Sequence, residues 1–386
     1  MGHGMNEKFT ELCPQMKITG TYNTAVVFND HVDNESRNQI QEFCNQEIFR
    51  DARIRIMPDV HAGKGCVIGY TASLGSKVVP NLIGLDIGCG IHVTRLGKMS
   101  YGYEKLDRFI RQHIPHGFKR NKQAAPGDFP ADFIEDLRQS CQSLDIDFTE
   151  QLKGVGSLGG GNHFIEIATD SDKTKWLLIH SGSRNFGLQV CTRHQSKAIQ
   201  SCKEKEIMIP KHFAFLEGDA RDAYISDMKV AQRYAQLNRQ EMTRRILIHL
   251  GISDNTEQFE TIHNYINFKD QIIRKGAVSA HQGEKMVIPL NMRDGSLIAL
   301  GKGNPEWNYS APHGAGRRLS RNQARKQLDF KDFKKEMKQV WTSTVSEKTL
   351  DEAPMAYKPK EELLQYIEES VEISDTLKPV YNFKSE

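Results

Sequence analysis

Residues 81–93 read NLIGLDIGCGIHV, an apolar run interrupted by one aspartate, Asp86, and one cysteine, Cys89. Gly88 and Gly90 permit a sharp turn that lets both side chains point at one centre. An Asp86 cap beside an inert, buried Cys89 thiol explains an isolated pair equally well. The stretch therefore predicts either a structural turn or two ligands of one metal site.

Short β-type segments surround this stretch. They alternate with turns over residues 16–100, and glycine-rich loops flank further strands expected within 154–168 and 176–187. Residues 277–301 return to short strands, and a last short strand is expected around 380–384. The strands are joined by tight turns or by helical stretches, which predicts an α+β fold with a mixed or antiparallel β-sheet core.

Helical patterns fill the intervening chain at about 34–49, 101–152 and 190–250, and again before the last strand. The 190–250 stretch is expected to be a helical hairpin laid on the sheet, with small and apolar residues at helix spacing: Ala231, Tyr234, Ala235, Asn238 and Met242. No linker divides the chain. We therefore expect one large domain over 16–386 with flanking helices, preceded by a tail at 1–15 whose opening MGHG reads as a cloning remnant.

Composition sets the general class of protein. The chain has 386 residues, of which 38% are hydrophobic and 26% charged, as in ordinary globular proteins. A net charge of +3 and a pI near 8.3 are too mild for a basic surface over the whole chain, so any phosphate-binding surface must be local. Seven cysteines form no even framework, which favours a reducing, cytoplasmic compartment. No run approaches the ~20 apolar residues of a membrane span, so no membrane partner is expected.

Three histidines interrupt other apolar segments: His163 in GGGNHFIEI, His180 in WLLIHSGSR and His263 in ETIHNYINF. Any one of them alone is more often a satisfied structural histidine than a ligand. Together with Asp86 and Cys89 they provide one carboxylate, one thiolate and three imidazoles, which suits borderline divalent metals. A shared thiolate could bridge two ions.

A further histidine, His313, stands in NYSAPHGAGRRLSRNQAR between small residues and a basic predicted helix. Small residues before a helix N-terminus, backed by arginines, suit an anionic phosphate. A histidine there could accept a phosphoryl-type group covalently, whereas a loop histidine beside a solvated basic helix is the structural alternative. The basic residues are Arg317, Arg318, Arg321, Arg325 and Lys326.

Nine segments resemble, in the same order, the motifs of the RtcB family of RNA ligases. They span nearly the whole chain from about residue 16: RIMPDVHAGKG (55–65), VPNLIGLDIGCG (79–90), GSLGGGNHFIEI (156–167), IHSGSRNFG (179–187), RKGAVSA (274–280), GKGNPEW (301–307), HGAGRRLSR (313–321), DEAPMAYK (351–358) and TLKPVYNFK (376–384). The resemblance implies a GTP- and manganese-dependent enzyme that joins RNA ends carrying a 2′,3′-cyclic or 3′-phosphate to 5′-hydroxyl ends, in RNA repair or splicing.

The resemblance also implies roles for single residues. Two Mn²⁺ ions would be held by Asp86, Cys89, His163, His180 and His263, with Cys89 bridging. His313 would be the catalytic nucleophile that takes GMP from GTP, and the activated phosphate would then pass through an RNA(3′)pp(5′)G intermediate. Nucleotide contacts are expected from Asn162, Phe164, Glu166, Asn291, Ser296, Gly314, Ala315, Gly316 and Lys384. Asp59, Arg184, Arg317 and Arg321 are expected near the phosphates and the RNA.

The chain departs from the family pattern in one loop. The usual G-S-M-G is replaced by Leu290, Asn291, Met292 and Arg293, so nucleotide preference is open and Arg293 adds bulk and charge. Few residues separate His263 from His313, as expected of a compact bacterial paralogue. Two other classes remain: a metal-dependent hydrolase that opens RNA cyclic phosphates without ligation, and a non-catalytic RNA-binding subunit. An archease-like activator is a further expected partner.

Overall fold

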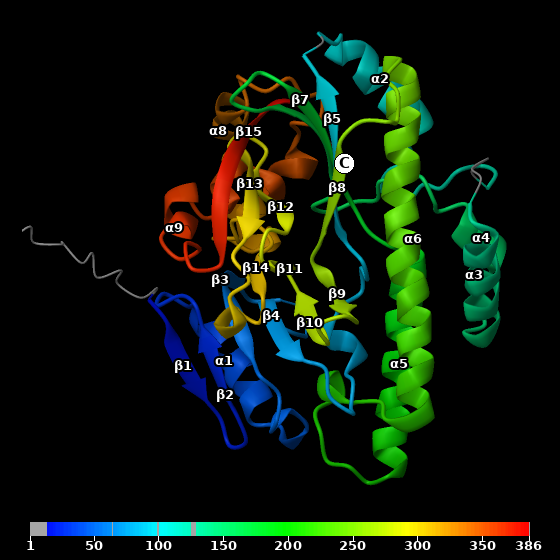
Figure 1. The fold of residues 1–386 in the computed structure, drawn as a ribbon, viewed down its shortest axis with the longest axis vertical. Helices are drawn as coiled ribbons and strands as arrows, with labels where there is room; N and C mark the ends of the chain where they lie inside the picture. Colours follow the sequence, from blue (N-terminus) through cyan, green and yellow to red (C-terminus); the bar gives the residue numbers. More distant parts are fainter. Residues whose placement is uncertain (1–13, 64, 99, 125–128, 386) are drawn as a thin grey trace, which may run out of the picture.

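The computed structural model describes residues 14–63, 65–98, 100–124 and 129–385. The expected tail at 1–15 lies outside these ranges except for its last two residues, and the first strand begins at Met16. Two large β-sheets and one small one form the centre of the molecule, with helices packed around them (Figure 1). The predicted α+β class, with mixed and antiparallel sheets and flanking helices, is confirmed.

The first sheet has six strands, and every neighbouring pair is antiparallel except β2 with β3. Its order is β1 (Met16–Thr19), β2 (Thr24–Val27), β3 (Arg55–His61), β4 (Ile68–Ser73), β10 (Ile272–Lys275) and β9 (Asn264–Asn267). The small sheet pairs β11 (Ala277–Ser279) with β14 (Ser310–Pro312). The end of β3 supplies Asp59, and the end of β14 leads directly into His313.

The second sheet has seven antiparallel strands. Its order is β12 (Lys285–Asn291), β13 (Gly295–Gly301), β15 (Val371–Lys384), β6 (Phe164–Thr169), β7 (Lys175–Ser181), β5 (Gly90–Gly97) and β8 (Gln258–Ile262). The last strand, β15, is much longer than the expected 380–384. Its first half exposes polar side chains, and its register shifts beside Pro379, which cannot donate to the ladder. These features hide the strand in the sequence.

Two long helices form the hairpin expected at about 190–250. They are α5 (Arg184–Glu204) and α6 (Gly218–Leu250), which pack against each other and flank the sheets (Figure 1). The hairpin begins earlier than expected and is interrupted at 205–217. The shorter helices are α1 (Asn34–Cys44), α2 (Tyr103–His113), α3 (Ala131–Ser143), α4 (Phe148–Leu152), α7 (Arg321–Gln327), α8 (Phe330–Glu336) and α9 (Lys360–Leu364). None of the helices in the described ranges is both long and apolar enough to cross a bilayer.

One face of α6 is buried and holds the loops that carry the predicted ligands. The Asn238 amide accepts hydrogen bonds from the backbone N–H groups of Gly156 and Ser157 at 2.8 and 3.0 Å, and donates to the Gly182 carbonyl at 3.0 Å. The fully buried Arg239 donates to the Gly88 carbonyl at 2.7 Å. Because buried polar groups are costly unless paired, these bonds fix the loops in one arrangement.

Candidate active site

The Asp86 to Cys89 turn is shaped by glycine and by helix α6. Gly88 has φ of 71°, which side chains rarely tolerate, and a Cβ there would lie 2.9 Å from Ala235 of α6. The Cys89 backbone N–H donates to the Asp86 carbonyl at 3.2 Å and closes the turn. Both side chains therefore face the end of strands β6 and β7.

The five predicted metal ligands form one continuous row. Asp86 Oδ2 lies 2.8 Å from His163 Nε2, and the Cys89 sulfur lies 3.5 Å from the same nitrogen and 3.3 Å from His180 Nε2. His180 Nε2 is in turn 3.3 Å from His263 Nε2. Cys89, His163 and His180 alone form a group capable of holding a metal ion. The sulfur occupies the middle of the row, where a ligand shared between two ions would have to be.

The histidine tautomers are fixed by backbone carbonyls. His163 Nδ1 lies 2.7 Å from the Leu158 carbonyl, and His180 Nδ1 lies 3.2 Å from the Asn162 carbonyl. A carbonyl can only accept, so each Nδ1 carries a proton, and each Nε2 is directed toward the centre of the row. Burial lowers the pKa of His180 well below its usual range, which keeps the ring neutral as a metal ligand requires.

The Cys89 thiol responds to the same burial in the opposite way. Burial, and next the nearby charge of Asp86, raise its pKa well above the usual range. A thiolate is the form that binds metal, and a divalent cation reverses this effect by stabilising the deprotonated sulfur. The donor set of one thiolate, imidazoles and a carboxylate fits a borderline divalent metal ion.

His313 lies beside this row. Its ring meets the ring of His263 at a centroid distance of 5.0 Å in an edge-to-face arrangement. Asp59 at the end of β3 is fully buried, and its Oδ2 accepts from His313 Nδ1 at 2.6 Å and from the His313 backbone N–H at 3.2 Å. The bond to Nδ1 leaves Nε2 as the free ring nitrogen, which is the atom a nucleophile needs.

The HGAG segment after His313 packs closely against its neighbours. Gly316 has φ of 77°, and a Cβ there would lie 2.5 Å from the Asp59 carbonyl oxygen. The Ala315 backbone N–H donates to the Pro289 carbonyl at 3.1 Å, while a Cβ on Gly314 would come within 3.0 Å of that oxygen. The segment is therefore held against β3 and β12, with little room for larger residues.

Strands β6 and β15 form one wall of the site. Phe164 and Glu166 lie on one face of β6, and their cross-strand partners on β15 are Lys384 and Asn382. Lys384 Nζ lies 5.6 Å above the Phe164 ring, and Asn382 donates to Glu166 Oε2 at 2.7 Å. Asn382 was not predicted as a site residue, although its place opposite Glu166 follows from the pairing of the strands.

Glu166 offers an acceptor with no partner. Its Oε1 is buried and makes no hydrogen bond to any residue in the described ranges. Burial raises the pKa of this carboxyl to about 8, with Asn382 and Lys384 acting against that rise. A buried orphan acceptor is costly unless a ligand supplies donors, and the N–H groups on the edge of guanine are such donors.

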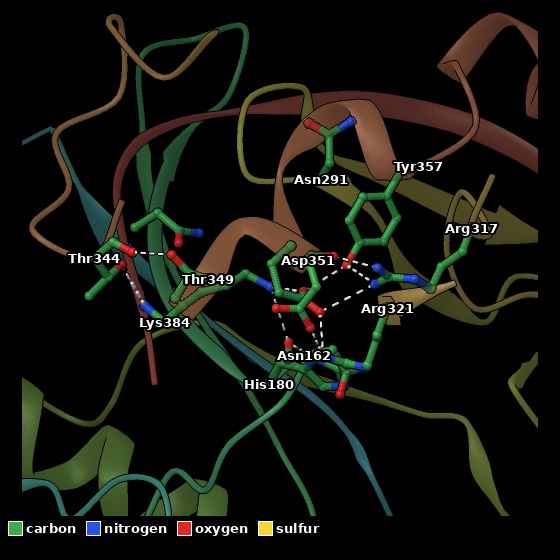
Figure 2. A network of polar contacts seen from close by, with 12 residues as sticks. Asn162, His180, Asn291, Arg317, Arg321, Thr344, Thr349, Asp351, Tyr357 and Lys384 are labelled. Atoms are coloured by element: carbon green, nitrogen blue, oxygen red, sulfur yellow. Dashed lines mark hydrogen bonds and ion pairs between the residues drawn. The ribbon is translucent and has the colours of Figure 1, made fainter. Parts of the chain in front are cut away.

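Two acidic residues that were not predicted as site residues form ion pairs with the basic residues of the site. Asp351 and Glu352 end a short 3₁₀ helix (Glu347–Glu352), and Figure 2 shows Arg317 and Arg321 pointing toward Asp351. The Tyr357 hydroxyl donates to Glu352 at 2.7 Å. Arg321 donates to Asp351 at 2.8 Å and lies 2.9 Å from Glu352. Burial would raise the pKa of Glu352, but Lys384, Arg321 and Arg317 outweigh it and lower that pKa to about 2. Arg317 and Arg321 therefore reach the site already paired.

The loop at 290–293, which departs from the family pattern, keeps Arg293 out of the site. Asn291 caps the turn between β12 and β13: its Oδ1 accepts from the backbone N–H groups of Arg293 and Asp294, and its amide donates to Asp294 at 2.8 Å. Arg293 pairs with Asp294 and Glu336 and does not line the cavity. The expected bulk at Arg293 therefore points away, while the second N–H of the Asn291 amide is available for a nucleotide contact.

One cavity of about 1100 Å³ joins most of these residues. The predicted residues that line it are Asp86, Cys89, Asn162, Phe164, Glu166, His180, His263, Asn291, Ser296, His313, Gly314, Ala315, Gly316, Arg317, Arg321 and Lys384. His163 and Asp59 lie just behind its wall through their bonds to Asp86 and His313. Arg184 is placed differently: its guanidinium donates to Ser157 Oγ at 3.2 Å and to the Gly117 carbonyl at 2.8 Å.

Comparison with known proteins shows the family of the chain. A family model described as tRNA-splicing ligase RtcB matches residues 39–143 and 135–385. The RNA-splicing ligase RtcB of Escherichia coli strain K12 is 33% identical over 386 aligned residues, covering 90% of this chain and 94% of that protein. The tRNA-splicing ligase RtcB of Nanoarchaeum equitans is 25% identical, covering 81% of this chain and 84% of its own.

These matches cover the loops that carry the Cys/His row, the HGAG segment and the closing strand. The chain spans nearly all of the Escherichia coli protein, so it is not short against that relative. The chain belongs to the RtcB family.

Proposed function

We propose that the protein is an RNA ligase that uses GTP and manganese to join RNA ends bearing a 3′-phosphate or 2′,3′-cyclic phosphate to 5′-hydroxyl ends, in RNA repair or splicing. Family membership and the names of the relatives support RNA ligation. The observation that carries the finer proposal is the position of His313, whose ring lies 5.0 Å from His263 at the end of the Cys/His row. His313 and four of the five proposed metal ligands, Asp86, Cys89, His180 and His263, line one cavity, which supports the proposal.

Two Mn²⁺ ions would be held by Asp86 and His163 on one side of Cys89 and by His180 and His263 on the other. When bound, they would neutralise the charge of the triphosphate and polarise the phosphorus that is attacked. The orientation of the His163 and His180 rings, which directs both Nε2 atoms into the row, supports this assignment. Glu166 Oε1, a buried acceptor without a partner in the described ranges, supports guanine as the base.

His313 supplies the covalent step. Because Nδ1 donates to Asp59, the Nε2 lone pair can form a bond to the α-phosphorus of GTP as the bond to the β-phosphate oxygen breaks and pyrophosphate leaves. An oxygen of the RNA 3′-phosphate then takes the GMP from His313 and gives RNA(3′)pp(5′)G. The 5′-hydroxyl oxygen of the second RNA end attacks the activated phosphate, and GMP leaves.

A guanylylation assay tests this proposal. The full chain is incubated with Mn²⁺ and GTP labelled at the α-phosphate, and the protein is separated under denaturing conditions. We expect label that is labile in acid, stable in alkali and lost in His313→Ala. Wild-type protein that takes no label while it opens RNA cyclic phosphates would favour the alternative, a metal-dependent hydrolase without ligation. RNA binding that survives Cys89→Ala, with neither reaction, would indicate a non-catalytic subunit.

Location and accessory partners belong to the same proposal. The cytoplasm is the proposed compartment, supported by six free, buried cysteines among the described residues. An archease-like activator is proposed as a possible requirement for repeated turnover. Ligation by the purified chain alone, followed over several turnovers, tests that requirement.

A further inference from the structure

The loop at 115–122 reads PHGFKRNK and presents an aromatic ring to solvent. Phe118 is fully exposed, more than any other large hydrophobic residue in the described ranges. Lys119, Arg120 and Lys122 follow it closely. Within the described ranges, neither Lys119 nor Lys122 has a carboxylate partner, whereas Arg120 pairs with Glu150 at 2.9 Å. An exposed aromatic ring among unpaired cations invites a ligand that offers both a flat face and negative charge.

The loop is held in place at both ends. The backbone N–H of Gly117 donates to the Gly159 carbonyl at 2.9 Å, and the Leu158 N–H donates to the Pro115 carbonyl at 2.8 Å. On the other side, the Asn121 amide donates to the carbonyls of Lys153 and Val155 at 2.9 and 2.7 Å. Phe118 is thus carried on an ordered loop, which lowers the cost of ordering it when a ligand binds.

The same bonds join the loop to the active site. Its neighbours Leu158 and Gly159 belong to the glycine-rich segment that continues into His163, and the Leu158 carbonyl fixes the His163 ring at 2.7 Å. Arg184 bridges the two segments through its bond to the Gly117 carbonyl at 2.8 Å. The loop that carries Phe118 is therefore hydrogen-bonded to the segment that leads to a predicted metal ligand. Phe118 itself lies outside the cavity that holds the nucleotide candidates.

A groove of about 900 Å³ lies beside the loop and is lined by residues of the loop, of α2 and of the end of α6. The cations that line it are Arg111, Lys119, Arg120, Lys122, Arg244 and Arg245. Its lining contains one carboxylate, Glu241, which is shared by Arg244 and Arg245 at 2.8 Å each. Arg111 is paired with Asp107 at 2.9 Å and Arg120 with Glu150, so the excess positive charge of the groove comes from Lys119, Lys122 and the two arginines that share Glu241.

We propose that Phe118 and this groove bind single-stranded RNA next to the end that is joined, with a base stacked on Phe118 and phosphates along the groove. The inference rests on the proposed ligase function, which requires an RNA end at the neighbouring cavity. Base stacking on an exposed ring and backbone contacts from cations are the two features of sequence-tolerant single-strand binding. An acidic protein would match the charge but would give no reason for a solvent-exposed ring on the loop.

The test measures RNA affinity by fluorescence anisotropy, with the full chain, Mn²⁺ and no GTP. It compares a single-stranded RNA that carries a 3′-phosphate with the same RNA without its bases. Wild type should bind the ordinary RNA about tenfold more tightly than the abasic one, a usual effect of one stacked base. Phe118→Ala should lose that difference, and Phe118→Trp should restore it. Lys119→Ala should weaken both RNAs and lower the slope of log affinity against log salt by about 0.7.

Met208→Ala is the matched control, because Met208 is also fully exposed but lies in the connection between α5 and α6. It should leave both affinities unchanged. Two results would overturn the stacking site: equal affinity of the wild type for the two RNAs, or an equal loss of affinity for both RNAs in Phe118→Ala. Either result would favour an acidic protein as the ligand of the groove. Binding is measured without GTP, so failure of His313 labelling and failure of this docking site are distinguishable.

Discussion

Asp59 lies directly behind His313 as a fully buried carboxylate with one oxygen bonded and one free. Oδ2 accepts from the His313 ring at 2.6 Å, whereas Oδ1 has no hydrogen-bond partner within the described ranges. A buried carboxylate oxygen without a donor is costly, so the position is held for a purpose other than stability. The bond to Nδ1 fixes which nitrogen of His313 can attack, and a positive ring formed during the reaction would be stabilised by the carboxylate beside it.

Asp59→Asn should slow guanylylation of His313 by about 10²-fold or more, because the amide can present its N–H to the ring and favour the wrong tautomer. The rate of label transfer from GTP measures this directly. Thermal unfolding should change little, since the substitution preserves shape. Asp375→Asn, at a half-buried acid on β15, is the control and should label at the wild-type rate. Wild-type labelling by Asp59→Asn would show that the bond only positions the loop.

Cys89→Ser should weaken manganese binding by at least about tenfold. Even residues that only hydrogen-bond to a metal ligand lower the metal affinity by about that factor when they are replaced. The sulfur contacts both His163 and His180, so its loss should affect both ions rather than one. Free Mn²⁺ measured by electron paramagnetic resonance gives the stoichiometry and affinity. Cys202→Ser, at a buried thiol near Phe215, is the matched control. Two ions bound at wild-type affinity would exclude Cys89 as a bridge.

The proposed metal ligands and His313 could be named from the sequence because each interrupts an apolar segment near a strand. That pattern is local: a polar side chain stands beside a glycine-rich loop, as at Asp86 before β5, His163 before β6 and His180 near the end of β7. Resemblance to a family then assigned their roles. The structure adds the order of the ligands, with Cys89 between His163 and His180, which no spacing along the chain encodes.

The missed residues depend on pairing between distant segments. Asn382 contacts Glu166 across 216 residues of sequence, and it is selected only because β15 lies beside β6 in that register. Glu352 lies in a segment whose motif was recognised, yet its role follows from three separate segments that deliver Arg317, Arg321 and Lys384 to it. Such contacts are fixed by tertiary structure and leave little periodic signal.

Glu352→Gln should destabilise the fold by roughly 3–5 kcal/mol, because it leaves Lys384 and Arg317 in a buried site without their counter-charge, whereas Arg321 keeps Asp351. The wild-type pair also predicts acid sensitivity. The pKa of Glu352 is lowered from 4.5 to about 2, so its contribution is present above pH 4.5 and is lost as the pH falls toward 2. The free energy of unfolding, measured with urea at pH 7 and at pH 3, should fall less between these two pH values in the variant than in the wild type. Glu372→Gln, exposed on β15, should behave as wild type.

Glu166 should release a proton when GTP binds. Burial raises its pKa to about 8, so the carboxyl is largely protonated at pH 7 in the free protein, whereas guanine N–H donors favour the ionised form. The sign for stability is the reverse of that for Glu352: the raised pKa favours the fold at low pH, and that contribution is lost as the pH rises from 4.5 through 8. Calorimetric titration with GTP at pH 7, in buffers with different ionisation heats, should show up to about one proton released beyond that in Glu166→Gln. The Gln variant cannot ionise, so equal proton release by the two proteins would show that Glu166 does not meet the base.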